Sequence, residues 1–415
     1  MAAPTTAPLT WERRRFFLML GAPALGMAMV VTVISTYLPV LVVEASGPVL
    51  VGVLIGAEGF FGIFMPLLVG TWSDRRSTTV RDRLPLLVGF AVVVVAAMAA
   101  VGVTAGLGAR SFVWYAPVLV LVFGGYYAFL APYWSIYPDL VPDQESGRSR
   151  SAEGTMRVIG VGLALVGGGL LLDVWVGLPF LVGAAVAAVV TVVLVVALRP
   201  HLSEPVEKDT SGRRSLATAF SLLREPGIRV MCLAEGLWNF ALSALRAFVV
   251  LYFTVGLDRS STFVATVIFP LVAVGIAAAA PTVGWLADRV GQVRVLLVAT
   301  TVYAVGMALP GFTSAWWVIV VIPVVAAGAA TVMTLPFSVL MRLIPERNHG
   351  AASGLFGFSR GLGSTLGPLV AGVTILVLAP VLDDTQGYAA MWWVCSAALL
   401  LTIPLLWRVR HDDRL

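Results

Sequence analysis

PDQESGRSRSAEGTMRVIGVGLALVGGG, residues 142–169, and PERNHGAASGLFGFSRGLGSTLGPLVAG, residues 345–372, are two versions of one segment. A shift of 203 positions lays Pro142 on Pro345 and Arg157 on Arg360, and it lays glycine on glycine at four further positions. Such agreement among prolines, glycines and charged residues indicates an internal repeat that spans about half of the chain.

A short loop motif repeats as well. The motif G-x-x-x-D-R occurs twice, 214 positions apart. Its residues are Gly70, Asp74 and Arg75 in the first copy and Gly284, Asp288 and Arg289 in the second. The longest polar stretch, 199–229, lies between the two copies. We therefore expect an N-terminal half over 1–198, a linker over 199–229 and a C-terminal half over 230–415.

Long apolar runs fill both halves. Of the residues, 59% are hydrophobic and 12% are charged, whereas a soluble domain is roughly half apolar and about a quarter charged. Because roughly 20 apolar residues cross a bilayer, the sequence predicts an all-α integral membrane protein with twelve transmembrane helices in two pseudo-symmetric six-helix bundles. The expected helices are 16–43, 49–70, 84–107, 112–137, 151–172, 174–198, 230–255, 262–286, 295–312, 316–343, 351–380 and 388–407.

The basic residues indicate how the chain is oriented in the membrane. Of 27 Lys and Arg residues, 22 fall in loops and ends that the helix order places on one side, and only Arg110 and Arg259 fall on the other. Basic loops face the cytoplasm. We expect a multi-pass protein of the bacterial cytoplasmic membrane, surrounded by the lipid bilayer, with both termini in the cytoplasm.

Other function classes find little support in the sequence. The histidines His201, His349 and His411 fall in a linker, a loop and a tail, and Cys232 and Cys395 fall inside apolar helices. Neither a catalytic triad nor a metal cluster is therefore expected. No phosphate-binding loop of the G-x-x-x-x-G-K-[ST] type is present. We expect no enzyme activity, no cofactor, no nucleic-acid partner and a monomer.

The two six-helix halves, the polar linker and the paired G-x-x-x-D-R loops resemble the major facilitator superfamily across the whole chain. The resemblance implies a carrier that moves a small-molecule substrate by rocking one half against the other. It also implies that the loop residues Asp74, Arg75, Asp288 and Arg289 form an inner-gate lock, in which ion pairs bias one access state.

A finer resemblance lies in two segments of the N-terminal half. PLLVGTWSDRRSTTVRDRLP (66–85) and PYWSIYPDLVP (132–142) are similar to the glycoside, pentoside, hexuronide and sucrose symporters. This resemblance implies a sugar or glycoside as solute, and it places Arg157 where an arginine of those symporters contacts substrate hydroxyls. Sodium-coupled members of that branch carry a pair of acidic residues on the second helix. In this chain the pair would fall near Phe61 and Met65, which are not acidic. We expect a proton rather than sodium as the coupling ion.

Ionisable groups inside the bilayer are costly, and those present are candidate site residues. Glu58 lies about 14 Å along its helix from Val49, close to the bilayer centre. A carboxyl group there is suited to bind and release a proton, although a fixed salt bridge is the alternative. Arg157 and Arg360 lie deep in the helices at 151–172 and 351–380, where they could also hydrogen-bond helix carbonyls. The family resemblance implies that the helices at 49–70 and 351–380 meet, so Arg360 is the expected partner of Glu58.

The helix at 230–255 has a polar stripe. Glu235, Asn239 and Arg246 follow at i, i+4 and i+11, which places them within about 40° of one face. The resemblance implies that this helix lines the central cavity, so the stripe is a predicted substrate-binding surface. The alternative interpretation is that Glu235 belongs to an inner gate.

Aromatic residues mark one face of the helix at 112–137. Tyr126 and Tyr133 lie in its middle, with Trp134 beside them. Such rings can stack on a sugar or an aromatic solute while their hydroxyl groups form hydrogen bonds. We predict these three residues as substrate contacts.

The sequence thus predicts a secondary active transporter that moves a small solute, such as a sugar or glycoside, by proton-coupled alternating access. One alternative is a proton-driven antiporter that exports a drug or metabolite. A second alternative, from another class, is a membrane sensor or scaffold without transport activity.

Overall fold

The computed structural model describes residues 10–205, 221–344 and 349–409, and the side chains of Asp74 and Arg75 lie outside the described part. The described chain is helical, apart from one isolated β-bridge between Thr79 and Pro205. Eleven of its helices are long and apolar enough to cross a membrane.

The first helix, α1 (Trp11–Arg76), contains two of the predicted spans. Its apolar stretch, Trp11–Gly70, has 60 residues, which at 1.5 Å per residue is about three times the thickness of the hydrocarbon layer. The helix is broken at Gly47, where φ is 73° and ψ is 170°. Only glycine adopts this conformation without strain, and Pro48 follows it as the first residue of the next helix. Two spans therefore meet at Gly47, and the prediction of twelve helices is confirmed.

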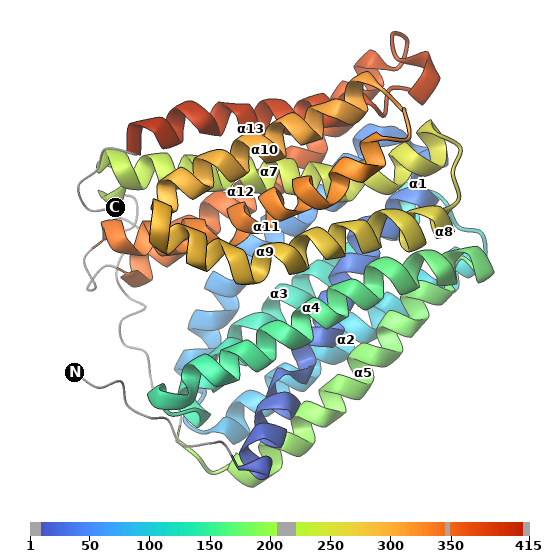
Figure 1. Cartoon of the computed structure of the whole chain (residues 1–415). Helices are drawn as coiled ribbons and strands as arrows, with labels where there is room; N and C mark the ends of the chain where they lie inside the picture. The colour runs from blue at the N-terminus through green and yellow to red at the C-terminus, as the bar shows by residue number, and fades with distance from the viewer. Residues whose placement is uncertain (1–9, 206–220, 345–348, 410–415) are drawn as a thin grey trace. The chain divides into compact units, whose positions relative to one another are not determined.

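The remaining elements follow the predicted order (Figure 1). The helices and 3₁₀ or π turns are α2 (Val80–Gly106), α3 (Phe112–Leu140), α4 (Asp143–Val174), α5 (Leu178–Leu198), η1 (Arg199–His201), α7 (Pro226–Leu251), η3 (Tyr252–Gly256), α8 (Ser261–Phe263), η4 (Val264–Ile268), α9 (Phe269–Val290), α10 (Gln292–Phe312), α11 (Val318–Leu343), α12 (His349–Leu378), η6 (Asp383–Thr385) and α13 (Ala390–Val409). The predicted span 262–286 is formed by α8, η4 and α9, whose π turn is continuous with the α-helix. The predicted span 174–198 begins later, at Leu178, because Trp175 to Gly177 form the turn after α4.

Helix contacts divide the chain into two compact units. Unit 1 comprises residues up to 34 together with 64–109 and 113–209, and unit 2 comprises 35–63, 110–112 and 210–415. The segment 35–63, which surrounds the break at Gly47, therefore belongs with the C-terminal helices. The predicted division at 199–229 stays a prediction, and residues 206–220 of that linker lie outside the described part.

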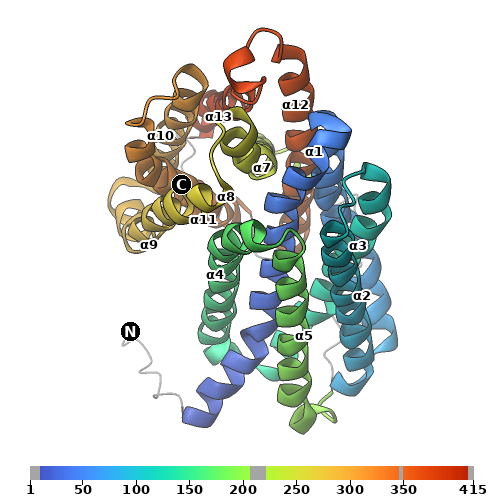
Figure 2. The same cartoon turned by 90° about the vertical axis from the view of Figure 1, so that its right-hand side faces the viewer.

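In unit 2, α7 packs against both α12 and α13, and α10 packs against α11 and α13. Figure 2 shows α12 beside α1. Three glycines of α1 allow this approach, since a Cβ atom at Gly52, Gly56 or Gly59 would lie 2.4, 2.7 or 2.4 Å from a backbone oxygen of α12. The opposing residues are Pro368, Thr365 and Gly361, respectively. We call these six residues the glycine seam.

Within each unit, the repeated glycines serve the same packing purpose. In unit 1, a Cβ atom at Gly160 of α4 would lie 2.2 Å from the backbone oxygen of Leu25 in α1. In unit 2, a Cβ atom at the matching Gly363 of α12 would lie 2.0 Å from the backbone oxygen of Gly236 in α7. The absence of a side chain at these matched positions lets α4 and α12 each approach a neighbouring helix closely.

Candidate functional site

A polar cluster in unit 2 joins Ser35 and Glu58 of α1 to Arg246 of α7. Arg246 Nη2 donates to Glu58 Oε2 at 2.9 Å and lies 2.8 Å from Ser35 Oγ, which in turn lies 2.9 Å from Glu58 Oε2. The Glu58 side chain is 13% exposed and that of Arg246 is 32% exposed. The predicted intramembrane carboxylate is therefore shielded and paired with a cation.

The fold explains why these residues meet. Ser35 precedes and Glu58 follows the break at Gly47, so the reversal of the chain at this glycine returns Glu58 to the level of Ser35. Gly59, next to Glu58, contacts α12 through the glycine seam. Because successive residues of a helix are separated by about 100°, Glu58 is turned away from α12 and toward α7.

A second polar cluster lies about 16 Å farther along α7, as expected for positions eleven residues apart. Glu235 Oε1 accepts hydrogen bonds from Asn239 Nδ2 at 2.8 Å and from Arg360 Nε at 3.0 Å. Arg360 Nη2 lies 2.9 Å from the same oxygen. The Glu235 side chain is 2% exposed, whereas that of Arg360 is 52% exposed. The predicted polar stripe of α7 is thus divided between two ion pairs.

The predicted pairing of Glu58 with Arg360 is wrong. The two helices do meet, as expected, but Arg360 shares the α7-facing side of α12 with Gly363 and Gly367, whose Cβ atoms would contact the backbone of α7. The side that faces α1 begins one residue later, at Gly361. This step of about 100° directs Arg360 to Glu235.

In unit 1, Arg157 pairs with Glu153 on its own helix, one turn earlier. The Arg157 side chain is 47% exposed and that of Glu153 is 8% exposed. The guanidinium carbon also lies 5.8 Å from the centre of the Trp134 ring, within the range of a cation–π contact. Arg157 and Trp134, both predicted substrate contacts, therefore lie near each other.

The tyrosines of α3 differ in their surroundings. Tyr133 is fully buried, and its hydroxyl group lies 2.8 Å from both the backbone oxygen of Leu20 and the hydroxyl group of Tyr137. This residue packs α3 against α1, which differs from its predicted contact with solute. Tyr126 is half-buried, with its ring 4.8 Å from that of Tyr127 in an edge-to-face arrangement. Of the predicted tyrosine pair, only Tyr126 has partly accessible surface in this structure.

The predicted inner-gate residues are described in part. The side chains of Asp74 and Arg75 lie outside the described part of the structure. Asp288 and Arg289, at the end of α9, are exposed, and the Arg289 guanidinium carbon lies 4.1 Å from the centre of the Trp285 ring. The loop after α1 contacts the segment that follows η1, since Val80 N donates to Glu204 O at 3.1 Å and Thr79 forms a β-bridge with Pro205.

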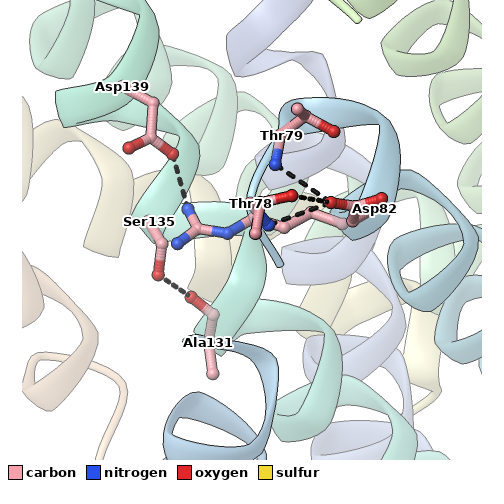
Figure 3. Close-up of polar contacts among 7 residues, drawn as sticks. Thr78, Thr79, Asp82, Ala131, Ser135 and Asp139 are labelled. Atoms are coloured by element: carbon pink, nitrogen blue, oxygen red, sulfur yellow. Dashed lines mark hydrogen bonds and ion pairs between the residues drawn. The ribbon is translucent and has the colours of Figure 1, made fainter. Parts of the chain in front are cut away.

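Sequence reasoning missed a buried ion pair beside this loop. Arg83 Nη1 of α2 lies 2.6 Å from Asp139 Oδ2 of α3, and the two side chains are 2% and 1% exposed. Figure 3 shows Asp139 and, nearby, Asp82, whose carboxylate accepts hydrogen bonds from Thr78 and Thr79. The signal was available, because Asp139 follows the predicted helix 112–137 and an acidic residue at a helix end can meet a basic loop.

We expect Arg83→Gln to destabilise the protein strongly, by about 3–5 kcal/mol, because it removes the cation that faces the buried Asp139 carboxylate. The double substitution Arg83→Gln with Asp139→Asn removes both charges and should recover most of the loss. Melting temperatures of the purified proteins in detergent measure both effects. Equal melting temperatures for wild type and Arg83→Gln would show that the pair contributes nothing.

The sequence and the fold were compared with those of known proteins. The model of the Major Facilitator Superfamily matches residues 4–165, 151–368 and 247–414, which together cover nearly the whole chain. Solved structures are similar over most of the chain. A bacterial homolog of the human lysosomal transporter Spinster, in an inward-facing and unoccupied conformation, has a TM-score of 0.73 at 17% identity and covers 96% of both chains. The nucleoside transporter NupG has a TM-score of 0.75 at 15% identity, over 96% of this chain and 100% of that one.

One curated relative is similar in sequence over a shorter stretch. Multidrug resistance protein 3 of Bacillus subtilis (strain 168) is 29% identical over 101 residues, which are 24% of this chain and 20% of that protein. The solved structures share the helical fold of this chain, and the family model extends over both of its halves. The chain therefore belongs to the major facilitator superfamily, a family of membrane transporters rather than enzymes.

Proposed function

We propose that this transporter is driven by protons and that Glu58 is the proton-binding residue. The supporting observation is the contact of Glu58 with Arg246 and Ser35, which links α1 to α7 through one shielded carboxylate. An intramembrane acid that is both shielded and paired is a candidate for a proton relay in a carrier. A coupling proton has a direct structural consequence here, because the ion pair holds two helices together.

The proposed step is a change in this ion pair. When Glu58 takes up a proton, its carboxyl group becomes neutral and the charge-assisted bond from Arg246 weakens. The neutral carboxyl group can still donate to a hydroxyl oxygen such as that of Ser35. Uptake of a proton by Glu58 therefore favours separation of α1 from α7, and release of the proton favours their renewed contact. This link between protonation and helix position is the coupling that alternating access requires.

For the solute, the first candidate is a sugar or glycoside that moves together with the proton. Arg157, Trp134 and Tyr126 support this candidate, since a half-exposed guanidinium group and partly exposed aromatic rings can bind hydroxyl groups and stack on a sugar ring. The second candidate is export of a drug or metabolite in exchange for protons. The local similarity to a protein named for multidrug resistance favours this alternative.

Purified protein in liposomes with an imposed pH gradient tests the proposed function. We expect at least one solute from a panel of sugars, glycosides, small organic acids and lipophilic cations to cross against its own gradient, with a matching change of internal pH. Movement in the direction of the proton indicates symport, and movement in the opposite direction indicates antiport. Solute movement that is insensitive to the pH gradient at every condition would contradict proton coupling.

We also infer that both termini face the cytoplasm, since 22 of the 27 basic residues fall on that side in the predicted topology. A small tag inserted at Gly47, where α1 is broken, should react with an impermeant label on intact cells. A tag in the linker at 206–220 should react only after the cells are opened. The opposite labelling pattern would reverse the assigned orientation.

A further inference from the structure

Arg360 uses only part of its hydrogen-bonding capacity on Glu235. Nε and Nη2, on one edge of the guanidinium group, both lie within 3.0 Å of the single oxygen Glu235 Oε1. Half of the arginine side chain is nevertheless exposed, whereas the glutamate is buried. A guanidinium group carries five N–H donors in a planar fork, so a second edge remains for another acceptor.

Glu235 and Asn239 hold this arginine in place. Asn239 Nδ2 donates to the carboxylate of Glu235 at 2.8 Å and to its backbone oxygen at 3.0 Å, which fixes the buried carboxylate against α7. The fixed carboxylate in turn fixes the orientation of the guanidinium plane. Gly363 brings the α12 backbone close enough to α7 for this contact. The cation is therefore prepared in one orientation, which reduces the entropy lost when a ligand binds.

The exposed part of Arg360 is expected to face water rather than lipid. A charged guanidinium group in contact with hydrocarbon costs several kcal/mol, whereas polar residues of membrane helices face an aqueous interior. Arg360 lies eleven residues into α12, too far from the start of the helix to reach the surface easily. An ordered and half-exposed cation inside a transporter can form charge-assisted bonds with an anionic ligand.

Arg157 shows the same division of its side chain at the matching position of the repeat. Its buried partner Glu153 is 8% exposed, and 47% of the arginine side chain remains accessible. The other arginine of the bilayer, Arg246, differs because it is 32% exposed and bonds to both Glu58 and Ser35. The two arginines of the repeat are thus more exposed than Arg246.

We propose that Arg360 binds the carboxylate of a small organic anion, with Glu235 and Asn239 as positioning residues. A carboxylate matches the free edge of a guanidinium group because two N–H donors and two oxygens form parallel charge-assisted bonds. The proposal rests on the proposed transport function and narrows its solute to an acid, such as a sugar acid or an aromatic acid. Glu235 opposes binding through its own charge, so its neutral form favours the anion.

Binding to the purified full-length protein tests the proposal. The probes are three pairs of an acid and its isosteric amide: benzoate and benzamide, lactate and lactamide, and glutarate and glutaramide. We expect at least one acid to bind about tenfold or more tightly than its amide, as a bidentate charge-assisted contact implies. Glu235→Gln, which keeps an oxygen acceptor for Arg360 but removes the opposing charge, should bind the acid more tightly still. A merely structural ion pair predicts no such gain.

Two further variants keep the test decisive. Glu235→Gln combined with Arg360→Gln leaves no unpaired buried charge, so it should fold and should bind acid and amide equally. Arg342→Gln removes one exposed positive charge at the end of α11 and should retain the preference for the acid. The proposal is overturned if no acid binds, if acid and amide bind equally in the wild type, or if the double variant keeps the preference. Because this measurement uses no gradient, it can fail while proton-driven transport stands, and the converse also holds.

Discussion

Glu58→Gln is expected to abolish accumulation of solute under a pH gradient while exchange of solute between the two sides of a liposome stays measurable. Glutamine keeps the size and the acceptor oxygen of glutamate, so Arg246 and Ser35 retain a hydrogen-bonding partner. It neither carries the charge of glutamate nor takes up a proton. The pH gradient therefore no longer drives transport by this variant. The helix movements that exchange requires remain possible.

A matched control lies on the same helix. Glu44 also pairs with an arginine, Arg110, but the side chains of this pair are 65% and 59% exposed. An exposed ion pair contributes little to stability or coupling, so Glu44→Gln should accumulate solute like the wild type. The measurement is uptake of labelled solute into liposomes with and without an imposed gradient. Full accumulation by Glu58→Gln would remove Glu58 from the coupling step.

The helices and their repeat could be predicted because they depend on local sequence. Membrane spans need long apolar runs, and the matched glycines Gly160 and Gly363 mark close helix approaches in both units. The break in α1 was also accessible, since a loop was expected between 43 and 49, and Gly47 with Pro48 supplies the conformation that ends one helix and begins the next.

The partners of the charged residues could not be predicted in the same way. Glu58 and Arg360 lie on helices that do touch, yet a difference of one residue along α12 turns a side chain by about 100°. The glycine seam selects Gly361 for the α1 side, and Arg360 then faces Glu235. Such choices depend on the rotation of each helix about its axis, which three-dimensional packing sets and periodicity alone does not reveal.

The extent of burial distinguishes the two candidate tyrosines of α3, which share one sequence pattern. Tyr126 and Tyr133 lie on one face of α3, but the hydroxyl group of Tyr133 bonds to the backbone of α1 and its ring is enclosed. The pattern of an aromatic face does not distinguish packing against a neighbouring helix from contact with a solute. The ion pair of Arg83 and Asp139 was missed for a similar reason, since loop bases are ordinarily solvated.

The same kind of substitution at two glycines should give two different failures. Gly59→Val and Gly363→Val each place a Cβ atom against backbone of a neighbouring helix, at 2.4 Å from Gly361 O and 2.0 Å from Gly236 O. Gly363 lies where α12 packs on α7, between helices of the C-terminal six. A clash there persists in every conformation, and overpacking of this kind costs about 1–3 kcal/mol or more. We expect Gly363→Val to lower the melting temperature markedly.

Gly59 lies in the glycine seam, where the second span of α1 meets α12. This span packs with the C-terminal helices in the structure, although the predicted division assigns it to the N-terminal half. If the proposed separation of α1 from α7 also separates α1 from α12 in one state, the valine clash arises only in the other state and excludes it. We therefore expect Gly59→Val to lower transport about tenfold or more and to leave the melting temperature close to that of wild type. Gly162→Val is the control, since no atom lies within 4 Å of a Cβ atom there. Transport rates in liposomes and melting temperatures in detergent compare the three variants. A loss of stability by Gly59→Val equal to that of Gly363→Val would mean that the seam is permanent, and the separation of α1 from α12 would have to be abandoned as a step of transport.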